Sequence, residues 1–121
     1  GMRRGEILSL KWKNVKVETQ SAFLPVTKNG TSRRVPLSNE AMKWILYSPK
    51  TEDRVFPITG IAFRQAWDRL RSRAGIYDLT FHDLRHEAIS RLFESGLKVH
   101  EVMAISGHKT ASQMFRYINI N

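Results

Sequence analysis

The segment His-Asp-Leu-Arg-His at residues 82–86 combines side chains that bind and activate anionic substrates. It opens a predicted helix running from about Phe81 to Ser95, with Thr80 placed to cap the first turn. At roughly 100° per residue, Arg85 falls on the apolar stripe of that helix. The stripe consists of Phe81, Leu84, Ala88 and Leu92, widened by Ile89 and Phe93. An unpaired charge facing inward, at the helix end that repels cations, is costly, so we expect an anion such as phosphate there.

An ordinary structural role for the same segment is the alternative. Arg85 pairs in that case with an internal carboxylate, either Glu6 or Asp83, and His82 and His86 are half-buried histidines without chemistry. One inward arginine alone favours this second interpretation, so the rest of the chain has to decide.

The length, charge and cysteine content of the chain limit the kinds of function that it can have. The chain has 121 residues, enough for one domain, and its 20 Lys+Arg against 11 Asp+Glu give a net charge of +9. Because the basic residues are spread along the chain, they favour a surface that faces nucleic acid, although a merely basic protein has the same charge. The absence of cysteine excludes disulfides and thiolate metal sites. No apolar run is long enough for a membrane span and no secretory signal is visible, so we expect an intracellular protein without a membrane partner.

The pattern of apolar residues predicts an α+β fold that is mainly helical. Three strands are predicted at residues 15–19, 22–27 and 32–37, with Asn29-Gly30 in the turn between the last two, as a small antiparallel sheet near the N-terminus. The predicted helices cover approximately residues 6–12, 38–47, 59–74, 81–95, 99–106 and 110–118. Residues predicted to face the core are Trp12, Met42, Ile45, Leu46, Ile61, Phe63, Ala66, Trp67, Leu70 and Ala74.

Further polar side chains outside the 82–86 segment have chemistry that fits a phosphate. Taken singly, Arg3, Lys28, His108 and Tyr117 each have an ordinary structural explanation. Together with residues 82–86 they amount to several phosphate donors, imidazoles and a hydroxyl nucleophile, without an acidic cluster for a metal. Such a set suits phosphoryl transfer in which the protein's own cations stabilise the transition state. Spacing alone leaves open which residue attacks.

Three separated motifs resemble the signatures of the tyrosine recombinase, or phage integrase, family. Residues 1–7, followed by Leu10-x-Trp12, resemble the first signature, and His82-x-x-Arg85-His86 resembles the second. Gly107-His108 with Tyr117 nine residues later resembles the third. Lys28, the only lysine between Lys16 and Lys43, stands where the family has its β-hairpin lysine.

The resemblance implies an enzyme that recombines DNA at specific sites without a cofactor or metal. Tyr117 would attack a scissile phosphate of double-stranded DNA, form a 3′-phosphotyrosine and release a 5′-hydroxyl. Arg3 and Arg85 would clamp the non-bridging oxygens, and Lys28 would be the general acid for the leaving oxygen.

The resemblance also implies roles for the imidazoles and one carboxylate. His82 and His108 would assist in charge stabilisation and proton handling. Glu6 matches the acidic position near the first arginine and would support it, and His86 matches a frequent second histidine.

The same resemblance bears on domain organisation. Residues 1–121 correspond to a catalytic domain that is incomplete at its N-terminus and lacks the core-binding domain. Because residues 1–6 enter a helical pattern at once, we expect the chain to begin inside a larger protein. The full-length protein would act with other recombinase subunits, as a tetramer on DNA, in the bacterial cytoplasm.

Two other functions fit part of the pattern. A DNA-binding module of the same fold that does not cleave would need none of the motif residues, whereas all of them are present. A zinc-dependent hydrolase would use His82 and His86, which lie one helical turn apart. Arg85 between them would repel the metal, and the glutamate of the metalloprotease motif is missing.

Overall fold

The computed structural model describes residues 1–25 and 31–117, and for Arg116 only the backbone. Lys28, the predicted turn at Asn29-Gly30, and Ile118 therefore lie outside the described residues.

A small antiparallel sheet follows the first helix, as the alternation predicts. Its strands are β1 (Val15–Lys16), β2 (Ser21–Leu24) and β3 (Arg33–Pro36), in the order β1-β2-β3. Ala22 on the central strand lies opposite both Val15 and Val35. The first and third strands are shorter than predicted, and residues 17–20 form a turn; the predicted end of the second strand at residues 26–27 lies outside the described residues.

Helices make up most of the described chain, which confirms the α+β prediction. They are α1 (Arg4–Ser9), α2 (Asn39–Tyr47), α3 (Gly60–Ala74), α4 (Phe81–Glu94) and α5 (Val99–Ser106), with short 3₁₀ helices η1 (Trp12–Asn14) and η2 (Ala111–Tyr117). The side chains of Ser38, Thr59 and Thr80 each accept a hydrogen bond from the third amide of the helix they precede. The last segment is a 3₁₀ helix where the sequence predicts ordinary helical turns. In the part of the chain that is described, no helix is both long and apolar enough to cross a bilayer.

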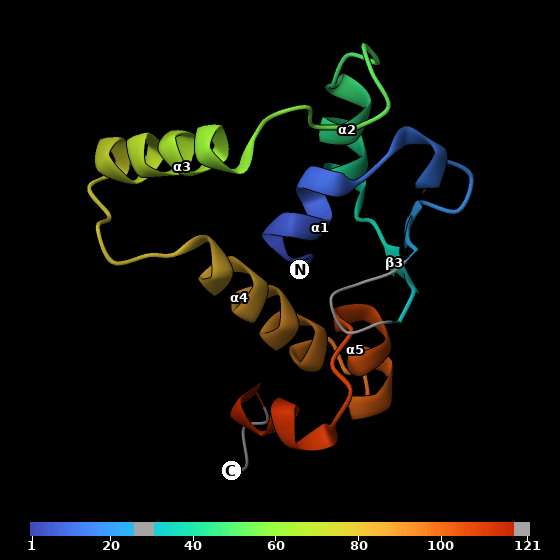
Figure 1. Ribbon diagram of the computed structural model, residues 1–121. Coiled ribbons are helices and arrows are strands. Elements are labelled where there is room, and N and C mark those ends of the chain that lie inside the picture. The colour runs from blue at the N-terminus through green and yellow to red at the C-terminus, as the bar shows by residue number, and fades with distance from the viewer. Residues whose placement is uncertain (26–30, 118–121) are drawn as a thin grey trace.

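Two apolar cores lie on either side of α5. The first joins the sheet to α2 and buries Leu10, Ala22, Leu24, Val35, Ile45 and Val55. The second lies among α4, α5 and η2 and buries Ile89, Val102 and Met114. Ile105 of α5 packs against the first core, while Val102 of the same helix belongs to the second. Figure 1 shows α5 next to β3, with α4 leading down to it from the side where α3 lies.

The predicted inward face of α3 is largely wrong. Ile61 is 73% exposed and Leu70 is 56% exposed, and none of the residues of α3 is fully buried. The helix is held chiefly by Phe63 and Trp67, whose rings pack edge-on against Phe81 at centroid distances of 4.8 and 5.6 Å. An amphipathic pattern identifies the face that can be buried, but a partner element must be present to bury it.

Three smaller predictions have mixed outcomes. Leu46 and Leu84, both predicted to be buried, are 53% and 43% exposed. Trp12 is half-buried and packs beside the first core, and the Lys50 ammonium lies 4.9 Å from its ring centroid. The aromatic anchor at the end of the first helical segment is therefore confirmed.

Candidate functional site

The start of α4 is fixed by a reciprocal pair of hydrogen bonds. The Thr80 amide donates to Asp83 Oδ2 at 2.8 Å, and the Asp83 amide donates to Thr80 Oγ1 at 3.2 Å. These bonds hold the pKa of Asp83 below its ordinary value. Because Asp83 is engaged at the cap, it is not the counter-ion of Arg85.

Arg85 is buried, at 4% exposure, as its position on the helix predicts. Its Nη1 donates to the carbonyl of Gly1 and its Nη2 to that of Ser106, both at 2.7 Å. Among the described residues it forms no ion pair with a carboxylate, so the alternative of a private pair with Glu6 or Asp83 is wrong. Burial, with the nearby charge of Arg3, lowers the pKa of Arg85 to about 10, and the group stays cationic at neutral pH.

Glu6 lies between two arginines. Arg33 Nη1 and Nη2 donate to its two oxygens at 2.5 and 2.9 Å, and the Arg3 amide donates to Oε1 at 2.8 Å. The Arg3 guanidinium is 3.6 Å from Oε2. Burial raises the pKa of Glu6, but the hydrogen bonds from Arg33 and from the Arg3 amide outweigh it, and the pKa lies below its ordinary value.

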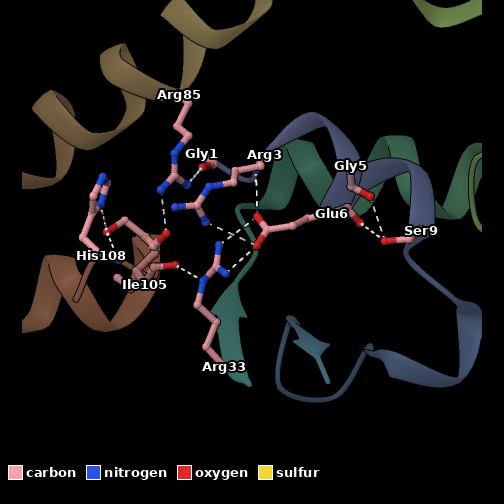
Figure 2. A network of polar contacts seen from close by, with 10 residues as sticks. Gly1, Arg3, Gly5, Glu6, Ser9, Arg33, Arg85, Ile105 and His108 are labelled. Atoms are coloured by element: carbon pink, nitrogen blue, oxygen red, sulfur yellow. Dashed lines mark hydrogen bonds and ion pairs between the residues drawn. The ribbon is translucent and has the colours of Figure 1, made fainter. Parts of the chain in front are cut away.

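The guanidinium groups of Arg3, Arg33 and Arg85 converge between the N-terminal segment, β3 and the end of α5 (Figure 2). Glu6 is the carboxylate drawn among them, so cations outnumber anions in this cluster. Arg33 and Arg85 are buried and bonded to protein groups, whereas the side chain of Arg3 is 30% exposed. The cluster therefore has surplus positive charge and one arginine open to an anion.

His108 joins this cluster from the end of α5. Gly107 ends that helix in the left-handed conformation, with φ of 83°, and the chain then places His108 Nδ1 at 2.6 Å from Ser106 Oγ. Burial, followed by the charges of Arg85 and Arg3, lowers the pKa of His108 to about 4. The imidazole is therefore neutral at pH 7 in the absence of a ligand.

Tyr117 meets the site through His86. The Tyr117 hydroxyl and His86 Nδ1 form a hydrogen bond, and the Tyr117 ring stacks on Phe93 at a centroid distance of 6.4 Å. His82 is exposed and packs edge-on against His86 at 4.6 Å. Of the two histidines on α4, the structure places His86, not His82, on the tyrosine. Tyr117 also lies close enough to Arg85 for its charge to raise the pKa of Arg85 slightly, against the larger lowering caused by burial.

A cavity of about 510 Å³ opens beside the cluster, between α1, α3 and α4. Arg3, His82 and Arg85 line it from one side, and Arg64 and Arg71 line it from α3. Aromatic rings of Phe63, Trp67 and Phe81 form part of its wall. His86, His108 and Tyr117 are not among its lining residues. The cavity is thus a basic recess that Tyr117 does not line.

The sequence predictions missed three participants. Arg33 is the most informative, because Val35 faces the core and side chains alternate along a strand, so Arg33 belongs to the same inward face. That alternation was the available signal. The carbonyls of Gly1 and Ser106 carry no sequence signal, because every residue has a backbone carbonyl.

The zinc alternative finds no ligand set within residues 1–25 and 31–117. No group of three or more His, Asp or Glu side chains there is arranged to hold a metal ion. His82 instead packs against His86, and His86 is hydrogen-bonded to Tyr117.

Comparison with known proteins identifies the family. The sequence matches the phage integrase family over residues 1–121. It is 47% identical over 121 residues to the shufflon-specific DNA recombinase of Escherichia coli, covering 98% of this chain and 32% of the relative. It is 43% identical over 115 residues to a putative integrase/recombinase of Haemophilus influenzae, covering 92% of this chain and 37% of the relative. The chain therefore spans about a third of the length of these relatives.

Solved structures share the fold. The crystal structure of XerA recombinase superposes with a TM-score of 0.77 at 20% identity, covering 99% of this chain and 49% of that one. The catalytic domain of bacteriophage HP1 integrase gives a TM-score of 0.70 at 27% identity, covering 95% of this chain and 65% of that one. With the family match over residues 1–121 and 47% identity to the shufflon-specific DNA recombinase, the chain belongs to the phage integrase family, the tyrosine recombinases.

Proposed function

We propose that the full-length protein is a site-specific DNA recombinase that cuts and rejoins DNA through a covalent 3′-phosphotyrosine at Tyr117. The observation that carries the proposal is the hydrogen bond between the Tyr117 hydroxyl and His86, next to the buried cation of Arg85. This contact supports a site in which Tyr117 is the nucleophile, His86 accepts its proton and Arg85 supplies positive charge for the phosphate.

Double-stranded DNA is the proposed substrate. The net charge of +9 and the arginine-lined cavity favour a polyanion. Two proteins of the same fold were solved with DNA, the XerH recombinase with its difH substrate and the Tn1549 transposon integrase with transposon right end DNA. Other subunits of the same recombinase, in a tetramer on DNA, are proposed as protein partners.

Charge neutralisation of the scissile phosphate is assigned to Arg3 and Arg85. Arg85 uses two of its five N–H donors on the carbonyls of Gly1 and Ser106, which orients the remaining donors. Arg3 is partly exposed and lines the cavity, so its guanidinium can reach an incoming phosphate. Preorganised cations of this kind stabilise the charge that develops on the phosphorane-like transition state.

Proton transfer accompanies the attack. A phenol is a poor nucleophile while it keeps its proton, so we assign His86 Nδ1 as the group that receives the proton as Tyr117 Oη attacks phosphorus. The bond from phosphorus to the 5′-oxygen breaks, and that oxygen takes a proton from Lys28, the general acid implied by the family resemblance. His82, packed on His86, assists charge stabilisation from the rim of the cavity.

The test is covalent trapping. A nicked duplex carrying the target sequence, incubated with the full-length protein, should yield a protein–DNA adduct that survives denaturing electrophoresis and is digested only by protease. An adduct that never forms, with DNA binding intact, would favour the non-cleaving DNA-binding module instead.

DNA binding should raise the pKa of His108. Burial, followed by the charges of Arg85 and Arg3, lowers the pKa of His108 to about 4, so the imidazole is neutral at pH 7 without DNA. A phosphate between these groups offsets their charge, and the midpoint is expected to move upward by about one pH unit or more. Proton-detected histidine NMR across pH 3.5–7.5, with and without DNA, measures it. A His108 midpoint that does not change when DNA is added would contradict the assignment.

The arginines that line the cavity should set the salt dependence of DNA binding. Each phosphate contacted contributes roughly −0.9 to the slope of log K against log salt. Arg64→Ala, which removes a lining guanidinium, should make the slope shallower by about that amount, measured by fluorescence anisotropy. Arg69→Ala, an exposed arginine of the same helix outside the lining, is the matched control. A salt-independent affinity would contradict a nucleic-acid substrate.

A further inference from the structure

We infer that Arg33 is a positioning residue. It holds Arg3 through Glu6, and it holds the end of α5, which carries His108. Both groups are thereby kept where they can receive the scissile phosphate. This inference rests on the proposed function.

Arg33 is buried where a strand would ordinarily carry an apolar side chain. Its side chain is 7% exposed and lies on the same face of β3 as Val35, which is 5% exposed. Burying a guanidinium is costly unless its donors are satisfied, and three donors of Arg33 have partners in the described structure. The sheet therefore contributes a cation that points into the site rather than to solvent.

The first contact of Arg33 leads to Arg3. Both Nη atoms bind the Glu6 carboxylate in a bidentate pair, which fixes the plane of that carboxylate. Glu6 in turn accepts from the Arg3 amide at 2.8 Å and lies 3.6 Å from the Arg3 guanidinium. Without Arg33, the Glu6 carboxylate could rotate toward Arg3 or Arg85. It would then neutralise the guanidinium charge that is proposed to bind the phosphate.

The second contact leads to His108. Arg33 Nε donates to the carbonyl of Ile105 in the last turn of α5 at 2.8 Å. A Cβ at Gly107 would lie 2.9 Å from Arg33 Nη1, so the guanidinium packs directly on the glycine that precedes His108. Gly107 also has a φ of 83°, and both constraints disfavour a side chain there. Arg33 thus stabilises the turn at Gly107, which sets the orientation of the His108 imidazole.

Arg33 is itself a poor ligand for phosphate. Its forked donors already bind Glu6, and its Nε binds a carbonyl, so its effect on the reaction is expected to pass through Arg3 and His108. Positive charge from Arg33 also contributes to the lowered pKa of His108.

The test compares two substrates for the full-length protein: a natural phosphate at the scissile position, and a methylphosphonate, in which a methyl group replaces one charged oxygen. Arg33→Lys keeps the charge but cannot form the fork and the Nε bond together. We expect it to slow adduct formation by about 10²-fold on phosphate, as for small misplacements of catalytic groups. On the neutral methylphosphonate the loss should shrink to less than about 10-fold, since Arg3 has no full charge left to neutralise.

Arg34→Ala is the matched control. Arg34 is the next residue of the same strand, is exposed on the opposite face and binds Ser21 Oγ at 3.1 Å, so its loss should leave adduct formation on both substrates unchanged. In a Glu6→Gln background, Arg33→Lys should cost less than in the wild type, because both changes act through one contact.

The outcomes separate the two proposals. Equal losses on the two substrates, an Arg33→Lys protein that does not fold, or an Arg33→Ala protein that cleaves like the wild type would each overturn the positioning role, although cleavage through Tyr117 would stand. Wild-type protein that binds DNA but forms no adduct with either substrate would overturn the proposed function and this inference with it.

Discussion

Tyr117→Phe is expected to abolish the covalent protein–DNA adduct while DNA binding stays within a few-fold of wild type. The change removes one oxygen, the proposed nucleophile, and leaves the ring that stacks on Phe93. Its cost in folding free energy should be limited to the lost hydrogen bond with His86, roughly 0.5–1.5 kcal/mol. Trapping on a nicked duplex measures the chemistry, and anisotropy with the same duplex measures the binding.

Tyr47→Phe is the matched control for that experiment. Tyr47 lies at the end of α2 and is 80% exposed, so removing its hydroxyl should change neither trapping nor binding. Trapping by Tyr117→Phe at the wild-type rate would remove Tyr117 from the role of nucleophile. Loss of trapping in Tyr47→Phe would show that the assay reports something other than the attacking hydroxyl.

Arg85→Ala should combine a catalytic loss with a loss of stability. Removal of one preorganised donor to a developing oxyanion typically costs about 10²–10³-fold in rate. The substitution also leaves the buried carbonyl of Ser106 without its donor, at about 1–3 kcal/mol, whereas Gly1 is exposed and water can replace the donor to its carbonyl. Single-turnover trapping gives the first quantity and thermal unfolding the second. Arg85→Lys should restore little of the trapping rate or of the thermal stability, because one ammonium group cannot replace a guanidinium that binds two carbonyls.

Arg91→Ala serves as the control on the same helix. Its side chain is 74% exposed and forms a pair with Glu87 of the kind that contributes a few tenths of a kcal/mol. Melting and trapping should therefore stay close to wild type. If Arg85→Ala behaved in the same way, the buried guanidinium would have neither of the two roles assigned to it.

Local signals in the sequence predicted the helices best. Thr80 before α4 and Ser38 before α2 cap free amides, and Gly107 after α5 takes a left-handed conformation, so these three boundaries agree with the structure to within a residue. Burial on α3 was predicted poorly, since it depends on which element lies opposite. Ile61 has the right spacing to be buried and is exposed because nothing in the described chain covers it.

The same distinction holds for the site. The inward position of Arg85 follows from helical periodicity, and the structure confirms it. Its partners are backbone carbonyls 84 and 21 residues away, which no side-chain pattern specifies. The contact of Tyr117 with His86 joins residues 31 apart and depends on how η2 folds back on α4. The roles of these residues in catalysis, and that of Lys28, remain predictions.

The position of α5 between the two cores makes the proposed site sensitive to packing on either side of that helix. This helix places Ile105 in one core and Val102 in the other, and its last carbonyls bind Arg33 and Arg85. Because α5 is only eight residues long, a change in side-chain volume in either core is expected to tilt the helix and to move His108, which follows its end. We therefore expect substitutions in either core to displace His108, and with it the proposed site, although every motif residue stays in place.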